Sequence, residues 1–180
     1  METAKLDTPI GELTIFVAAG RLCGLAFEEQ PEALRRQLER QFGSPELRPR
    51  RDPGGVLSRL RAYFAGELSA LDGIVTDVRG TTFQRRVWNA LTRIPVGATW
   101  SYAQLAAEIG APAAVRAVGA ANGRNPIAIV IPCHRVIASD GTLCGYGGGL
   151  DRKRWLLQHE GVWFERAAAR PRSRQAALAF

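Results

Sequence analysis

Cys133 and His134 stand side by side in the segment Ile131-Pro132-Cys133-His134-Arg135-Val136, and they are the two residues of this chain best suited to chemistry. A cysteine attacks only as a thiolate, and an unperturbed thiol has a pKa of about 8.5, so reaction at neutral pH needs a nearby base or a positive charge. This segment offers both. We therefore expect a nucleophilic thiol with His134 as its base. The alternative is an ordinary buried cysteine that packs as a small apolar side chain.

The element that must position the thiol is the apolar run 127–131, which predicts a buried strand. Pro132 is expected to end this strand and turn the chain, which would lift Cys133 out to an edge of the sheet. Neighbouring residues on a strand point to opposite faces. Cys133 and His134 can therefore cooperate only if the chain turns between them or if a water bridges them.

The bulk properties limit where the protein works. With 180 residues the chain can bury a substantial core, in one domain or in two small ones. It has no apolar stretch near the ~20 residues that cross a membrane, and residues 1–8 lack the apolar core of a secretion signal. Its three cysteines are unevenly spaced, which suits a reducing compartment. We expect a cytoplasmic protein that does not bind membranes.

The patterns typical of metal and dinucleotide sites are missing. Only two histidines are present, His134 and His159, and there is no Cys-x-x-Cys pair, so we expect no metal. The glycine-rich run 145–149 resembles a dinucleotide loop, but Leu150 occupies the place of the third glycine of Gly-x-Gly-x-x-Gly. We expect no cofactor.

Charge is divided unequally along the chain. Residues 1–80 carry eleven Lys or Arg and twelve Asp or Glu, whereas residues 81–180 carry thirteen and five, which gives net charges of −1 and +8. A field of one sign confined to one half is typical of a protein that binds a polyanion, most often nucleic acid. A merely solvated basic surface is the alternative.

The pattern predicts an α+β protein with a small N-terminal α/β domain, residues 1–79, that contains an antiparallel sheet. This domain has no catalytic constellation, so we interpret it as a scaffold. Its expected elements are a hairpin of strands 12–18 and 21–28 joined at Ala19-Gly20, a helix over 32–42, a loop over 44–55, a helix over 56–65 and a returning strand over 74–78.

Residues 80–163 predict a second, mostly helical domain with a short strand leading to Cys133. Thr81 or Thr82 is expected to cap a helix that ends at Leu91, and Ser101 to cap a helix over 102–109. After the break at 110–112, a helix over 113–121 would complete a helix-turn-helix, although an ordinary helical hairpin has the same pattern. The Arg-rich tail, residues 164–180, is predicted to be disordered or loosely helical.

The helix over 113–121 is rich in alanine around Arg116. Small side chains let a helix approach DNA closely, and the scarcity of polar groups that read bases favours a minor-groove contact nearly independent of sequence. Tight packing of the alanines against the core is the alternative.

The segment from Ile131 to Val136 also resembles the active-site signature of the O6-alkylguanine-DNA alkyltransferases, and about half of the chain shares the resemblance in the expected order. The other residues that carry it are Thr82-Phe83-Gln84, Val87-Trp88, Ile94-Pro95, Gly97, Ser101-Tyr102, Leu105-Ala106, Arg116-Ala117-Val118-Gly119, Asn122, Asn125-Pro126, Gly145-Tyr146, Gly148-Gly149, Lys153, Trp155-Leu156-Leu157 and His159-Glu160-Gly161.

The resemblance implies a role for each site residue. Cys133 would accept the alkyl group, His134 would be the base, and Glu160 would orient the imidazole. Asn125 would tie the recognition helix to the catalytic strand, unless it is only a turn residue before Pro126. The remaining residues implied to contact the extruded guanine or DNA are Tyr102, Arg116, Ala117, Ala120, Val136, Tyr146, Gly147 and Gly148.

The implied activity is irreversible transfer of an alkyl group from O6-alkylguanine in double-stranded DNA to Cys133 after base flipping, with O4-alkylthymine as a second candidate substrate. Each molecule would act once, as a monomer or in a cooperative assembly on DNA. Ala128 replaces a proline that lines the pocket in some relatives, so bulkier adducts are expected to fit. Alternatives are a non-catalytic protein that binds alkylated bases, which Cys133 disfavours, a cysteine hydrolase, and a sequence-specific regulator.

Overall fold

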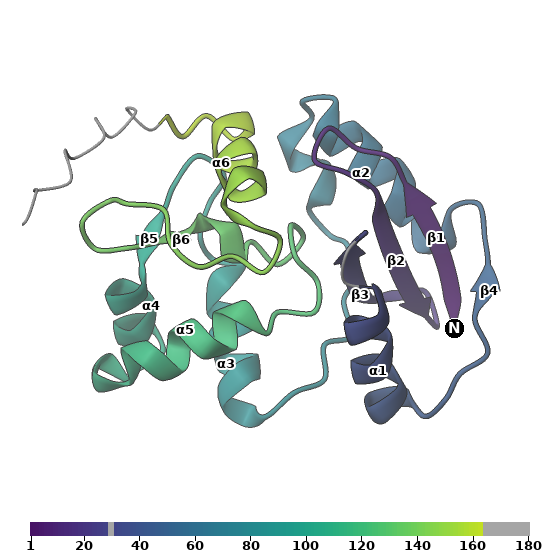
Figure 1. Cartoon of the computed structure of the whole chain (residues 1–180), viewed down its shortest axis with the longest axis horizontal. Coiled ribbons are helices and arrows are strands. Elements are labelled where there is room, and N and C mark those ends of the chain that lie inside the picture. Colours follow the sequence, from purple (N-terminus) through teal and green to yellow (C-terminus); the bar gives the residue numbers. More distant parts are fainter. Residues whose placement is uncertain (29–30, 164–180) are drawn as a thin grey trace, which may run out of the picture.

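The structure is a computed structural model that describes residues 1–28 and 31–163. Figure 1 shows a sheet with its helices on one side of the molecule and a group of helices on the other. We call these the sheet part, from β1 to the short helix η2 (Leu68–Leu71), and the helical part, from α3 to α6. The predicted α+β class is confirmed. The predicted tail, residues 164–180, lies outside the described residues.

The sheet part is built on four strands in the order β3-β2-β1-β4. Strands β2 (Leu13–Ala18) and β3 (Arg21–Phe27) form the predicted hairpin, with positive φ angles of 48° at Ala19 and 72° at Gly20. Strand β1 (Glu2–Leu6), which was not predicted, pairs antiparallel with β2. The short β4 (Arg48–Pro49) pairs parallel with β1, inside the stretch predicted as a loop.

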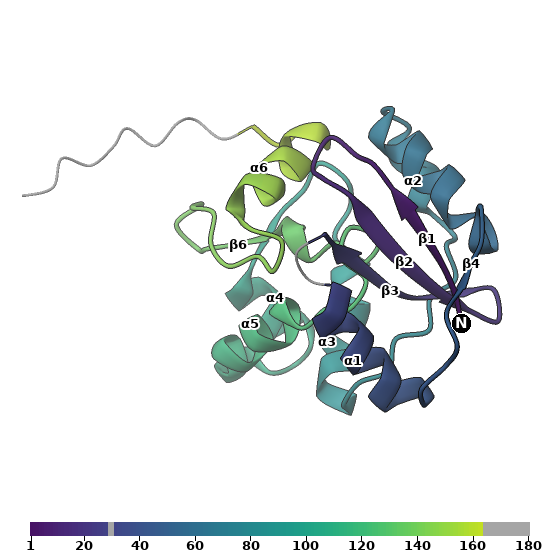
Figure 2. The same ribbon diagram turned by 45° about the vertical axis from the view of Figure 1, so that its right-hand side comes forward.

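A helix packs on each face of this sheet (Figure 2). Helix α1 (Pro31–Phe42) covers one face with Leu34 and Leu38, against Phe16 and Cys23. Helix α2 (Val56–Phe64) follows the short helix η1 (Pro53–Gly55) and packs into the main core with Val56, Leu57, Leu60 and Tyr63. This core continues into the helical part, so the two parts share one set of buried apolar side chains.

The helical part begins with α3 (Thr82–Leu91) and α4 (Tyr102–Glu108), which start as predicted. Thr81 and Ser101 each form a capping box with the glutamine three residues later, which satisfies two backbone N–H groups at each helix start. The short helix η3 (Pro112–Ala114) leads into α5 (Val115–Gly123), and α6 (Leu150–His159) closes the fold. Strands β5 (Trp100–Ser101) and β6 (Val136–Ile137) pair in parallel.

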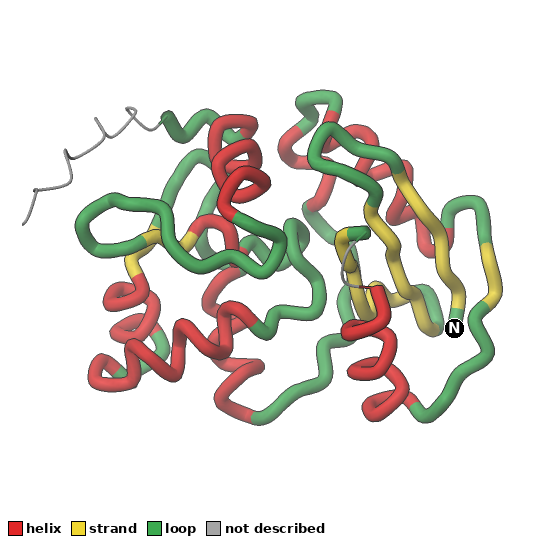
Figure 3. Tube along the Cα trace, viewed as in Figure 1, coloured by secondary structure: helices red, strands yellow, loops and turns green. Residues whose placement is uncertain are grey.

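Two predicted strands are wrong. Residues 127–131 form a tight turn in which the Ile131 N–H donates to the Ile127 carbonyl at 2.9 Å and Ile129 has a φ of 75°. Ile127, Ile129 and Ile131 are nevertheless buried, so burial produced the apolar pattern without an extended backbone. Figure 3 shows this connection after α5 as loop. Residues 74–78 make only one bridge, between Thr76 and Leu22.

Among the described residues, no helix is both long and apolar enough to cross a membrane.

Candidate active site

The proposed nucleophile lies in a helical turn and not at a sheet edge. Residues Cys133–Arg135 form the short 3-10 helix η4 directly after Pro132, so the predicted turn at the proline is confirmed. The expected lift of the thiol out of the sheet is wrong, because residues 127–131 before it form a turn and Cys133 is only 5% exposed. Its side chain instead forms part of the wall of a cavity of about 250 Å³.

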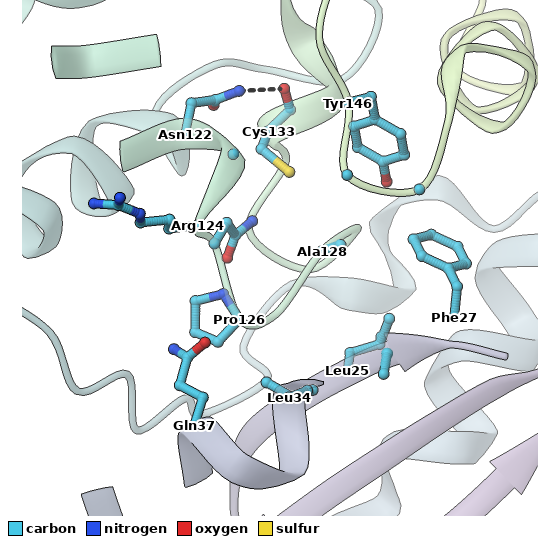
Figure 4. A pocket seen from close by; sticks show the side chains of 15 residues that line it. Leu25, Phe27, Leu34, Gln37, Asn122, Arg124, Pro126, Ala128, Cys133 and Tyr146 are labelled. Carbon is cyan, nitrogen blue, oxygen red and sulfur yellow. Dashed lines mark hydrogen bonds between the residues drawn. The ribbon is translucent and has the colours of Figure 1, made fainter. Parts of the chain in front are cut away.

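Both parts of the molecule build this cavity. Figure 4 shows the Cys133 sulfur directed into the space between Arg124, Ala128 and Tyr146, with side chains of the sheet part on the far side. The lining residues are Leu25, Ala26, Phe27, Leu34, Gln37, Asn122, Gly123, Arg124, Asn125, Pro126, Ala128, Cys133, Tyr146, Gly147 and Gly148. Because Gly123 and Arg124 are exposed residues at the end of α5, the cavity meets the surface beside that helix.

His134 is fully buried and bonded to Glu160. Its Nε2 atom lies 3.1 Å from Glu160 Oε1, as the resemblance implied. Its Nδ1 atom has no hydrogen-bond partner in the described part of the protein. The turn at η4 therefore does not bring the imidazole into direct contact with the thiol. Of the two arrangements expected from the sequence, a direct contact made by a turn and a contact through a water, only the second fits this geometry.

The Glu160 carboxylate, which follows α6, is held by more donors than the sequence suggested. Arg135 donates from Nε to Oε2 at 2.8 Å and from Nη2 to Oε1 at 2.9 Å, and the Tyr63 hydroxyl donates to Oε1 at 2.8 Å. Burial alone would raise the pKa of Glu160, but the hydrogen bonds from His134 and Arg135 lower it far below its ordinary value. Glu160 is therefore a carboxylate at neutral pH.

Burial also sets the protonation of the reacting pair. It raises the pKa of the Cys133 thiol, although a hydrogen bond from Asn125 and the charge of Lys153 act in the opposite direction. Burial lowers the pKa of His134 more than Glu160 raises it. The resting site thus pairs a neutral thiol with a neutral imidazole, and the thiolate must form by proton transfer at the moment of reaction.

Two asparagines link the end of α5 to the cysteine. Asn125 donates from Nδ2 to the Ile131 carbonyl at 2.7 Å and accepts from the Ile127 N–H at 3.0 Å. Asn122 donates to the Cys133 carbonyl at 3.4 Å. The tie expected from Asn125 is therefore present, although it fixes a turn and not a strand.

The sequence reasoning gave no role to Arg135, Tyr63 or Lys153. Lys153 is buried in α6, and its ammonium group donates to the Val136 carbonyl at 2.5 Å and to the Cys144 carbonyl at 2.7 Å, so it anchors the loop that follows η4. The role of Arg135 could have been inferred from its place beside the apolar segment that ends at Pro132, because a buried guanidinium requires an acidic partner. Nothing in the spacing pointed to Tyr63, which lies 97 residues before Glu160.

The remaining residues predicted to contact the guanine or DNA differ in how deeply they are buried. Tyr146, Gly147 and Gly148 line the cavity, with the Tyr146 ring edge-on to Phe27 at a centroid distance of 6.2 Å. Tyr102 is half-buried and donates to the Gly145 carbonyl at 3.4 Å, and burial raises its pKa to about 12.

Arg116, Ala117 and Ala120 are exposed on α5, outside the cavity wall. Val136 is fully buried in β6 and is not among the lining residues, so the structure does not bring it to the cavity.

Comparison with known proteins decides the family. Residues 82–162 match the model of the "6-O-methylguanine DNA methyltransferase, DNA binding domain", and residues 1–78 match that of its "ribonuclease-like domain". The chain belongs to the 6-O-methylguanine DNA methyltransferase family. The first match covers the helical part and the second covers the sheet part. The resemblance seen in the active-site segment therefore extends to both parts of the fold.

Relatives in this family cover nearly the whole chain. A methylated-DNA–protein-cysteine methyltransferase of Shigella flexneri is 48% identical over 160 residues, which is 87% of this chain and 94% of that protein. One of Mycolicibacterium paratuberculosis is 53% identical over 163 residues, 89% of this chain and 92% of that protein. The crystal structure of the OGT protein of Mycobacterium tuberculosis in complex with DNA superposes with a TM-score of 0.76 at 48% identity, covering 89% and 92% of the two chains.

Proposed function

We propose that Cys133 is the residue that takes the alkyl group from O6-alkylguanine in double-stranded DNA. The chain is a methylated-DNA–protein-cysteine methyltransferase, an enzyme of DNA repair that binds DNA. The observation that supports Cys133 is its place in the wall of a cavity that reaches the surface beside α5, with His134 and Glu160 behind it. Cys23, by contrast, packs against α1 in the sheet part and is not among the residues that line this cavity.

The step is a displacement at carbon. The thiol proton passes through a water to Nδ1 of His134, the His134–Glu160 pair holds the added charge, and the Cys133 sulfur forms a bond to the alkyl carbon. The bond between this carbon and O6 breaks, and its electron pair leaves with the purine. A hydrogen bond from Tyr102 to a ring nitrogen of the guanine stabilises the departing anion, which finally takes up the proton.

The lesion must leave the duplex before Cys133 can reach it, because the cavity is recessed. Arg116 is exposed on α5 beside Ala117 and Ala120, where it can fill the gap in the base stack while the small side chains allow close approach to the minor groove. Tyr146, Gly147 and Gly148 then enclose the flipped base. This contact reads no base sequence, as repair of scattered lesions requires.

Transfer occurs once in each molecule. The product is a thioether, and neither His134 nor Glu160 can displace carbon from it. We propose that the protein acts as a monomer, in the cytoplasm, with residues 80–163 providing the transfer and DNA-binding unit and residues 1–79 supporting it.

A duplex that carries O6-methylguanine with a labelled methyl group tests this function. The parent protein should take up one mole of label per mole, Cys133→Ser none, and both should bind the duplex. Cys144→Ser is the matched control, since this cysteine is half-buried and outside the cavity wall. Retained binding without transfer by the parent would indicate a non-catalytic lesion-binding protein, and turnover beyond one equivalent would refute the single-use mechanism.

A further inference from the structure

The Glu160 carboxylate receives one of its hydrogen bonds from the opposite part of the molecule. Tyr63 belongs to α2 of the sheet part, and its hydroxyl lies 2.8 Å from Glu160 Oε1. Both residues are buried: Tyr63 has no exposed surface, and the Glu160 side chain is fully covered. The sheet part thus reaches the group that orients His134, although it carries none of the residues that the sequence assigned to the reaction.

We propose that Tyr63 is a positioning residue for the transfer reaction, whose hydroxyl fixes the Glu160 carboxylate so that His134 keeps Nε2 as the donor and Nδ1 as the proton acceptor. This inference rests on the proposed role of His134 as the base. It gives the sheet part a share in the chemistry that acts through Glu160.

The arrangement of donors around Glu160 supports this role. Oε1 lies 2.8 Å from the Tyr63 hydroxyl oxygen, 2.9 Å from Arg135 Nη2 and 3.1 Å from His134 Nε2. His134 is the most distant of the three. Because several donors share one oxygen, removing the hydroxyl leaves more negative charge for the imidazole and lets the carboxylate turn.

The ring and backbone of Tyr63 are held independently of its hydroxyl. His159 Nε2 lies 2.7 Å from the Tyr63 carbonyl oxygen, and the His159 ring stacks on Trp155 at a centroid distance of 4.7 Å. The Tyr63 ring also packs edge-on against His159 and Phe64. A phenylalanine at position 63 can therefore keep this packing while it loses only the bond to Glu160.

The sign of the effect on His134 follows from its surroundings. Burial and the Glu160 charge raise the pKa of Tyr63, so its hydroxyl remains a donor at every pH of interest. Without this donor, Glu160 attracts a protonated imidazole more strongly, which raises the pKa of His134 and moves the loss of base activity to higher pH. Among the described residues, the titratable and charged groups that act on the His134–Glu160 pair are Arg135 on η4, Tyr63 on α2, Lys153 on α6 and Tyr146 on the loop before α6.

The test compares Tyr63→Phe with His159→Phe, which removes the hydrogen bond between His159 and the Tyr63 carbonyl and retains an aromatic ring on Trp155. Three quantities are followed against pH: the rate of methyl transfer from the duplex, the alkylation of Cys133 by iodoacetamide read by peptide mass, and the ¹⁵N shifts of the imidazole. The chain has only two histidines, so His159→Phe leaves the His134 signals alone in the spectrum.

Tyr63→Phe should slow methyl transfer at neutral pH by about fivefold to tenfold, as expected for partial loss of a hydrogen bond to a charged group. The acid limb of its pH–rate profile and the titration of the His134 imidazole should move to higher pH by about half a pH unit or more. His159→Phe should leave both unchanged. In a Glu160→Gln background, Tyr63→Phe should have no further effect on the rate.

An unchanged pH profile in Tyr63→Phe, or an equal slowing in the Glu160→Gln background, would overturn the positioning role. Equal rate losses in Tyr63→Phe and His159→Phe without a shift would reduce Tyr63 to a packing residue and refute it as well. Failure of the proposed function is separate, because the parent would then take up no label from the duplex while the iodoacetamide and ¹⁵N profiles still report on Tyr63.

Discussion

Gly148 should be intolerant of even one added methyl group, because two aromatic rings occupy the space. A Cβ atom built on Gly148 lies 2.5 Å from Phe27 Cε2 and 2.8 Å from Tyr146 Cε1, whereas ordinary contacts begin near 3.4 Å. Phe27 cannot move away freely, since the Arg152 guanidinium lies 4.6 Å from its ring centroid. A displacement of nearly 1 Å in a packed wall costs about 1–3 kcal/mol.

We therefore expect Gly148→Ala to lower the free energy of unfolding by about 1–3 kcal/mol. It should also slow methyl transfer, since Tyr146 and the cavity must shift. Urea denaturation measures the first effect and label transfer from the duplex the second. Gly147→Ala is the matched control for stability, because its added Cβ would be 3.9 Å from the nearest atom. In a Phe27→Val background, which removes the nearer of the two rings, Gly148→Ala should cost less. The same cost in both backgrounds would refute the steric explanation.

Arg135→Met should cost about 3–5 kcal/mol in urea denaturation, because it leaves the buried Glu160 carboxylate without its guanidinium. Arg154→Met breaks a surface pair in which Arg154 is half-exposed and Asp151 fully exposed, so it should cost far less than Arg135→Met. Similar values for the two variants would contradict the burial of the Arg135–Glu160 pair. The free energy of unfolding should also fall as the pH drops below 6.5, since burial lowers the pKa of His134 from that value and the unfolded chain then binds a proton that the folded chain excludes. His134→Gln should flatten this part of the profile, measured by denaturation at a series of pH values, and an unchanged slope would show that another group is responsible.

Local signals in the sequence were sufficient where a short segment determines its own conformation. Ala19-Gly20 supports the two positive φ angles of the hairpin, and Thr81 and Ser101 begin their helices with capping boxes. The run 127–131 misled because a short continuous apolar run is typical of a buried strand, whereas here Ile129 adopts a φ of 75°, which a β-branched residue rarely does. No local rule anticipates such a turn, which contacts outside the segment impose.

The contact between Tyr63 and the Glu160 carboxylate could not be predicted from local sequence signals either. The gap between Tyr63 and Glu160 carries no information about their distance, and only the packing of α2 against α6 brings them together. The first half of the chain, interpreted from its sequence as a scaffold, also supplies Phe27 to the cavity wall. Burial is the largest influence on the pKa of both Cys133 and His134, and the two parts of the molecule share one core. Removing the sheet part would therefore expose Tyr146 and Glu160 to water and lower the pKa of the Cys133 thiol toward that of a free cysteine. In the helical part alone, the same thiol would ionise at lower pH than in the whole protein.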